Sequence, residues 1–80
     1  METKYYTHES RQILDALIEA DGELTYIDIL QRTAISTMIA VSVMADLLRS
    51  EKIVYRMENG VQYFRVNSLK EHQRSINRRH

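Results

Sequence analysis

The sequence predicts an α+β domain in which three helices precede a two-stranded β-hairpin. Apolar residues recur every three or four positions up to residue 50, which is the period of amphipathic helices. After Glu51-Lys52 the period changes to two, as in strands that bury one face. Asn59-Gly60 then indicates a two-residue type I′ turn, because both positions of such a turn need positive φ angles.

The composition limits the function of this 80-residue chain, which is long enough for one small domain. The absence of cysteine excludes disulfides, thiolate metal sites and cysteine nucleophiles. No apolar run approaches the roughly 20 residues of a membrane span, and residues 1–11 lack the apolar core of a signal peptide. We therefore expect a soluble, cytoplasmic protein without a membrane partner.

The formal net charge is zero but unevenly distributed. Residues 1–66 carry seven basic and ten acidic side chains, a balance of −3, whereas residues 67–80 have a balance of +3. The prediction is a folded domain over 1–66 followed by a basic tail over 67–80. The basic residues of this tail are Lys70, Arg74, Arg78 and Arg79. Few apolar residues line any one helical face of this tail, so it is either a marginal helix or disordered.

The first helix is predicted over residues 8–20. Its apolar face consists of Ile13, Leu14, Leu17 and Ile18. Thr7 or Ser10 is the expected N-cap. Asp21-Gly22 ends the helix, because glycine takes the left-handed conformation after the last turn at no steric cost.

The second helix is expected over about residues 26–32. Thr25 is a suitable N-cap, and Asp28, three residues later, completes a capping box. Leu24 and Ile29 occupy the positions of a hydrophobic staple, which fixes the angle at which the chain enters a helix. This start is the best defined of the three helices.

The third helix, over residues 36–50, is unusually apolar. Its apolar residues cover an arc of about 260°, whereas a surface helix needs little more than about 100°. Only the turn 33–35 separates it from the preceding helix, so the two helices should cross steeply in helix-turn-helix geometry. Met38, Val41 and Ala45 lie furthest from its main apolar stripe. Either the first helix or the tail covers them, or they form an interface with a second copy or another protein.

The hairpin is predicted over 53–58 and 61–66. Its turn places Ile53 opposite Val66, Tyr55 opposite Phe64 and Glu58 opposite Val61. In this register one face is apolar and the other carries Arg56 and Arg65. The turn chemistry and the amphipathic pattern therefore indicate the same register.

This order of elements resembles the winged helix-turn-helix domains of small bacterial, archaeal and phage transcription regulators. The resemblance covers residues 9–66 and rests on the segments 24–30, 35–36 and 47–56. Family members commonly close the third helix with paired leucines, followed by a glycine and a strand with an arginine. This chain has Glu51 or Lys52 where that glycine is common.

The resemblance implies that the third helix enters the major groove of double-stranded DNA and that the hairpin wing contacts the backbone or minor groove. The implied groove-facing residues are Ser36, Thr37, Met38, Val41 and Ser42. Hydroxyls bond to base edges or phosphates, and Met38 and Val41 suit thymine methyl groups. The first two turns lack the Arg, Lys, Asn and Gln side chains that make bidentate pairs with bases.

Other residues supply positive charge or polar groups for contacts to the DNA backbone. These are Arg32 at the end of the second helix, Arg56, Asn59 and Arg65 on the wing, and the four basic tail residues. An alternative role for Arg56 and Arg65 is only to keep the hairpin soluble.

The sequence contains no catalytic or metal-binding pattern. His8, His72 and His80 lack metal-ligand spacing, and Gly22 and Gly60 serve turns rather than a phosphate-binding loop. We therefore expect no enzyme activity, metal, cofactor or small-molecule substrate.

Two functions remain as hypotheses. The first is a small DNA-binding transcription regulator or accessory factor, associated with the nucleoid and acting as a dimer, because a single neutral module binds DNA weakly. The second is a protein-interaction module that binds another protein through its apolar third helix.

Overall fold

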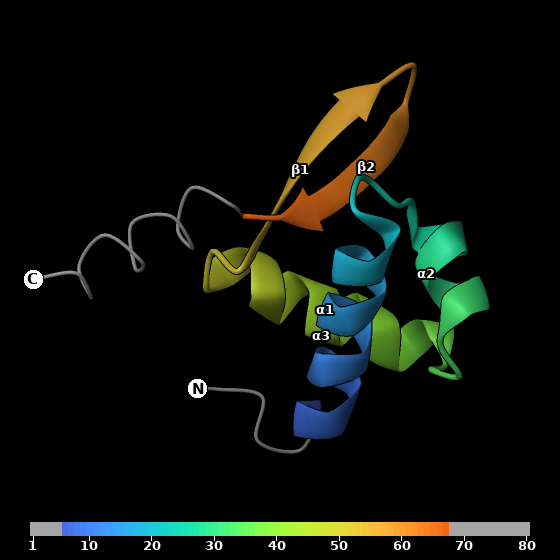
Figure 1. Cartoon of the computed structure of the whole chain (residues 1–80), viewed down its shortest axis with the longest axis vertical. Helices are drawn as coiled ribbons and strands as arrows, with labels where there is room; N and C mark the ends of the chain where they lie inside the picture. The colour runs from blue at the N-terminus through green and yellow to red at the C-terminus, as the bar shows by residue number, and fades with distance from the viewer. Residues whose placement is uncertain (1–5, 68–80) are drawn as a thin grey trace, which may run out of the picture.

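The computed structural model describes residues 6–67 of the chain. Its elements are α1 (Thr7–Ala20), α2 (Tyr26–Arg32), α3 (Thr37–Arg49), β1 (Ile53–Glu58) and β2 (Val61–Val66). The helices gather at one end of the antiparallel hairpin, whose turn points away from them (Figure 1). The predicted α+β class and order of elements are confirmed, while the predicted tail lies outside the described residues.

α1 begins and ends differently from the prediction. Tyr6 is its N-cap and makes no side-chain capping bond, so the predicted caps are wrong. Ser10 lies within the helix, and its buried Oγ has no hydrogen-bond partner among residues 6–67. At the other end Asp21, not Gly22, adopts the left-handed conformation, with φ 54°. Asp tolerates this conformation because its short polar side chain bonds locally.

The buried face of α1 is also rotated from the predicted one. Ile13, Ala16 and Leu17 are buried, whereas Ile18 is 61% exposed. Ile18 follows Leu17 by about 100° around the helix, which carries it off the core side. The assignment of Ile18 to the core-facing stripe is therefore wrong.

α2 starts as predicted. The Asp28 N–H donates to Thr25 Oγ1 over 3.2 Å, and the Thr25 N–H donates to Asp28 Oδ2 over 3.1 Å. These two reciprocal bonds form the capping box. Leu24 and Ile29 are both buried, in agreement with the predicted staple.

The chain bends by 116° between α2 and α3, which confirms the predicted steep crossing. The Thr33 hydroxyl donates to the Ile29 carbonyl over 2.9 Å at the end of α2. Ser36 Oγ then accepts the Ile39 N–H over 3.4 Å at the start of α3. Among the described residues no single helix is long and apolar enough to cross a membrane, although α2 and α3 taken together meet the same test.

Phe64 joins the hairpin to the helices. It is fully buried, and its ring meets the Tyr26 ring edge-on at a centroid distance of 4.8 Å. Its backbone exchanges two hydrogen bonds with Leu24, of 2.9 and 2.8 Å, so that Leu24 forms a one-residue bridge beside β2. The sequence analysis missed this bridge, because a single paired residue has no periodicity to detect.

The hairpin register is the predicted one at all three pairs named above. Asn59 and Gly60 have φ angles of 54° and 78°, as a type I′ turn requires. The helices cover only the base of the apolar face, where Ile53 and Phe64 are buried. Tyr55 lies opposite Phe64 on the same face but is 51% exposed.

Glu51 closes α3 in a strained conformation. Its φ angle is 64°, in the region that favours glycine. The Glu51 N–H donates to the Leu48 carbonyl and the Lys52 N–H donates to the Leu47 carbonyl, which is the Schellman pattern. Asn67 Nδ2 donates to the Glu51 carbonyl over 2.9 Å and holds this turn from the end of β2.

We predict that Glu51→Gly raises the free energy of unfolding by about 0.5–1 kcal/mol. Glycine adopts the left-handed conformation without the Cβ clash that glutamate suffers, and this gain exceeds its larger loss of backbone entropy. Urea-induced unfolding followed by circular dichroism measures the change.

Glu51→Ala is the matched control for this prediction, because it removes the charge at the C-terminal end of α3 but keeps the Cβ atom. Its stability should rise clearly less than that of Glu51→Gly. Equal gains in the two variants would assign the effect to the charge near the helix dipole and contradict the backbone explanation.

Candidate nucleic-acid interface

α3 divides into a core side and an exposed side. Ala40, Val43, Met44 and Leu47 are buried on the core side. The exposed side, called here the α3 outer face, consists of Ser36, Thr37, Met38, Val41, Ser42 and Ala45. Met38 is 82% exposed and Val41 is 48% exposed. Neither α1 nor any other described element covers this face. The other expected cover was the tail, which lies outside the described residues.

The α3 outer face offers methyl groups, a thioether and short hydroxyls. Its small side chains, such as Thr37 and Ser42, allow a flat ligand surface to approach the helix backbone closely. The one cation of α3 is Arg49 in the last turn, where it donates to Asp46 Oδ1 over 2.9 Å. The face therefore provides apolar and hydroxyl contacts but no long charged side chain.

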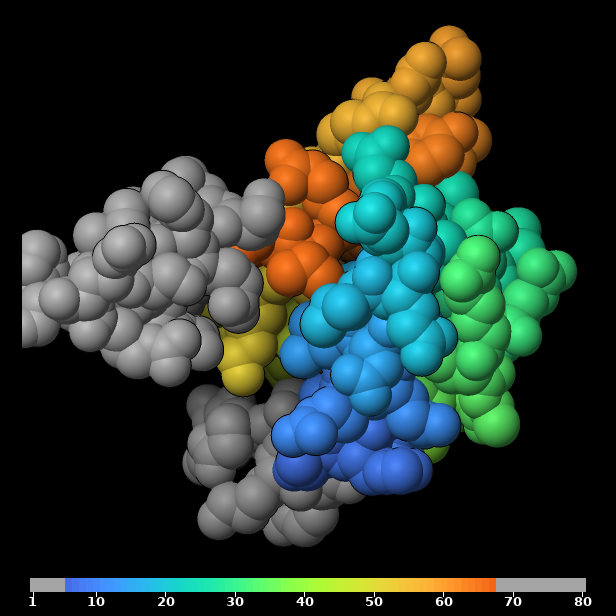
Figure 2. Space-filling model, viewed as in Figure 1, coloured from blue at the N-terminus to red at the C-terminus, as the bar shows by residue number. Residues whose placement is uncertain are grey.

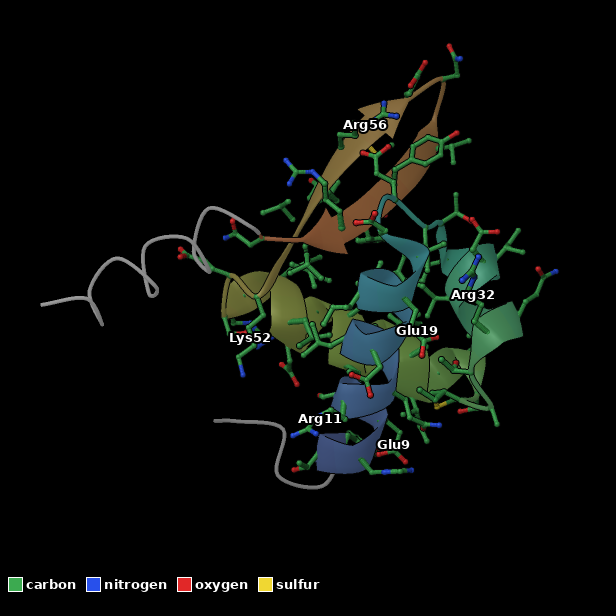
Figure 3. All side chains as sticks on the ribbon, viewed as in Figure 1. Glu9, Arg11, Glu19, Arg32, Lys52 and Arg56 are labelled. Atoms are coloured by element: carbon green, nitrogen blue, oxygen red, sulfur yellow. The ribbon has the colours of Figure 1, made fainter. Side chains whose placement is uncertain are left out.

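Arg32 and Arg65 are exposed and form no ion pair among residues 6–67. Arg32 ends α2 and lines an open groove of about 370 Å³ together with Asp15 and Glu19 of α1. Glu19 and Arg32 extend from their helices on the same side of the molecule (Figure 3). Both arginines are free to bind an anion, although the α1 carboxylates weaken the positive potential around Arg32.

Arg56 is already occupied by carboxylates. Its Nε and Nη2 donate to the two carboxylate oxygens of Glu23 over 2.7 and 2.8 Å, and its Nη1 donates to Glu58 over 2.5 Å. The guanidinium also lies over the Tyr63 ring, 4.7 Å from the ring centroid. The sequence analysis proposed Arg56 as a DNA contact, but the structure gives all three of its nitrogen atoms an internal partner.

The ion pair shifts the acid–base behaviour of both partners. The hydrogen bonds from Arg56 hold the pKa of Glu23 below its usual value of 4.5, and the nearby charge of Arg65 acts in the same direction. The pKa of Arg56 is raised in turn, mainly by Glu23. Because the pKa of Glu23 is lower in the folded than in the unfolded chain, the pair stabilises the fold above pH 4.5. This contribution is lost as the pH falls through the lowered pKa.

The remaining predicted site residues are spread out or outside the described part. Asn59 is exposed at the hairpin turn. The four basic tail residues lie outside the described residues. Among residues 6–67, no group of three or more His, Asp or Glu side chains is placed to hold a metal ion. The sequence analysis missed Glu23, because its partner Arg56 is 33 residues away and no local pattern links them.

We predict that the carboxyl group of Glu23 titrates below pH 4.5 in the wild-type chain, because hydrogen bonds from Arg56 favour its ionised form. In the Arg56→Gln variant the midpoint should move up toward the usual value. Carboxyl ¹³C chemical shifts recorded against pH measure it. An unchanged midpoint in the variant would show that Arg56 does not cause the shift.

No protein-family model matches the chain, and comparisons with curated proteins and with solved structures give no significant match.

Proposed function

We propose that the chain is a winged-helix DNA-binding protein that acts as a transcription regulator or accessory factor. The observation that carries this proposal is the 116° bend between α2 and α3, combined with an α3 outer face that the described residues leave uncovered. In a helix-turn-helix, this arrangement presents the second helix of the pair to the major groove. The protruding hairpin then serves as the wing.

The chemistry of the α3 outer face determines how such a helix reads DNA. Met38 and Val41 make apolar contacts with thymine methyl groups, and the hydroxyls of Thr37 and Ser42 bond to base edges or phosphates. Without bidentate pairs, discrimination between bases is modest. DNA shape and deformability therefore supply a larger share of the specificity.

Phosphate binding in this proposal depends on a few cations. Arg32 is the last residue of α2 and Arg65 stands on the wing, and both are exposed and without an ion pair among residues 6–67. The basic tail adds further positive charge. Because residues 1–66 carry a net charge of −3, a single copy should bind weakly. Two copies on adjacent half-sites give the affinity that a regulator needs.

The protein should shift random-sequence duplex DNA at low salt, and Arg32→Gln with Arg65→Gln should weaken that shift. Loss of two phosphate contacts lowers the slope of log K against log salt by about 1.8. Replacing the four basic tail residues with glutamine should lower the slope further. Fluorescence anisotropy over a range of salt concentrations measures these slopes.

Arg11→Gln is the control for charge loss alone, because Arg11 lies in the first half of α1 and is exposed. It should leave the slope nearly unchanged. Absence of binding by the wild-type chain at every salt concentration would refute the proposal.

A protein-interaction module is the second candidate function, and one observation favours it. The exposed apolar residues in the first two-thirds of α3 are Met38, Val41 and Ala45, which form a patch without a long polar side chain. Adaptable apolar patches of this kind are typical of protein interfaces. The occupant in this case is a second copy of the chain or another protein.

Val41→Glu separates the two candidate functions. Val41 is about half exposed, so the variant should fold with an unchanged thermal midpoint. Under the DNA-binding proposal it loses DNA affinity, because its carboxylate faces phosphates, while its mass in solution without DNA stays the same. Analytical ultracentrifugation with and without duplex DNA measures both properties.

Ile18→Glu is the matched control for this experiment, since it also introduces a carboxylate at an exposed apolar position, but on α1. It should bind DNA nearly as wild type does. A fall in oligomer mass without DNA, seen for Val41→Glu alone, would favour the protein-interaction function instead.

A further inference from the structure

Arg56 connects three segments that lie side by side near the middle of the hairpin. It stands on β1 opposite Tyr63 of β2, and its guanidinium passes over the Tyr63 ring. Beyond β2 the guanidinium forms an ion pair with Glu23. The next residue, Leu24, is paired with Phe64 of β2 through backbone hydrogen bonds. The segment before α2 packs against the base of the hairpin in the space-filling view (Figure 2). One side chain thus spans β1, β2 and the connection between α1 and α2.

We infer that Glu23 and Arg56 are a positioning pair that sets the orientation of the wing relative to α2 and α3, and that Arg65 is the wing residue that binds phosphate. The second half of this inference rests on the proposed DNA-binding function. The first half concerns the orientation of the hairpin and applies with or without DNA.

The hairpin needs such a device because few contacts hold its outer part. A two-stranded hairpin is only marginally stable by itself. Met57 and Val61 near the turn are both exposed, and Tyr55 is exposed except where its ring contacts Phe64, so the helices do not cover the outer part of the hairpin. The Leu24–Phe64 bridge anchors only the base of the hairpin. The burial of Ile53 and Phe64 acts at the same end of the hairpin, so a hairpin held only there can still change its tilt.

The Glu23–Arg56 pair adds a second anchor on the opposite face of the hairpin. Phe64 points into the core, whereas Arg56 and Tyr63 form the neighbouring pair in the register and face the other way. A bidentate arginine–carboxylate pair constrains direction as well as distance, because both groups are planar. Two anchors on opposite faces restrict both tilt and rotation of the ribbon.

The charges favour Arg65 over Arg56 as the phosphate contact. Arg56 with Glu23 and Glu58 forms a cluster of net charge −1, whose donors already point at carboxylates. A phosphate approaching Arg56 would have to displace these carboxylates and then lie beside them. Arg65 is exposed and forms no ion pair in the described part of the chain. The charge of Arg65 also lowers the pKa of Glu23, but its own N–H donors engage no carboxylate in the described part of the chain and are available to an anion.

The sign of the effect of Glu23→Gln on DNA affinity tests this inference in the full chain. If the pair positions the wing, this variant weakens binding to a duplex by roughly 3- to 10-fold although it removes a negative charge. Arg56→Gln should weaken binding equally, with the salt slope unchanged, and the double variant should be no worse than either. Arg56→Lys should not restore affinity, because lysine keeps the charge but lacks the planar fork. Arg65→Gln should lower the salt slope by about 0.9.

Glu9→Gln is the matched control, a carboxylate in the first turn of α1 outside the groove that Arg32 lines, and its neutralisation should leave affinity unchanged or raise it. Tighter binding by Glu23→Gln, together with rescue by Arg56→Lys, would overturn the inference and make Arg56 a phosphate contact restrained by Glu23. Thermal unfolding of each variant confirms that it is folded at the assay temperature.

Residual dipolar couplings without DNA keep the two proposals separate. The couplings of β1 and β2 relative to α3 should change in Glu23→Gln while those within α3 stay the same. If the wild-type chain binds no duplex, the proposed DNA-binding function is refuted. The couplings still show whether Glu23 and Arg56 set the orientation of the hairpin. Unchanged hairpin couplings would overturn the pair whatever the DNA result.

Discussion

Burial of Phe64 is the constraint on which the rest of the structure depends. This side chain is fully buried between the helices and the hairpin, and its backbone is paired with Leu24. Removing a buried phenylalanine ring typically costs about 3–5 kcal/mol, which is a large part of the stability of so small a domain. Because Leu24 also leads into the capping box of α2, the hairpin and the start of the helix pair are placed by the same contact. The position of the hairpin relative to the helix pair therefore follows from it.

α3 carries more apolar residues than the core needs because one of its sides is buried and the other is exposed. One side fills the core through Val43, Met44 and Leu47, and the other remains exposed through Met38 and Val41. No described side chain turns this exposed side into a charged one. Whatever binds there is recognised mainly by shape and apolar contact, which suits either thymine-rich DNA or a protein surface. In the proposed DNA complex, the electrostatic part of binding comes from residues on α2, the hairpin and the tail.

The electrostatics of the hairpin also separate residues that look alike in the sequence. Arg56 and Arg65 lie on the same face of the hairpin, yet one is held by two carboxylates and the other is unpaired within the described part of the chain. Glu23 makes the difference, because it reaches the hairpin from the α1–α2 connection. An ion pair of this kind restricts the orientation of the protruding hairpin, whereas an unpaired arginine lets the hairpin bind anions. The two roles are complementary in the proposed complex.

Local signals in the chain were enough to predict the element order, the α2 capping box and the hairpin register. Each of these depends on residues close in sequence: Thr25 with Asp28, and the Asn59-Gly60 turn with its alternating strands. Contacts between distant segments were beyond such signals. The Leu24–Phe64 bridge, the Glu23–Arg56 pair and the exposure of Ile18 arise only when the helices and hairpin are packed together. The positive φ angle of Glu51 also depends on a distant residue, because Asn67 at the end of β2 donates a hydrogen bond to the Glu51 carbonyl. Short-range chemistry thus specifies the elements, and long-range packing selects which of their side chains are free to act.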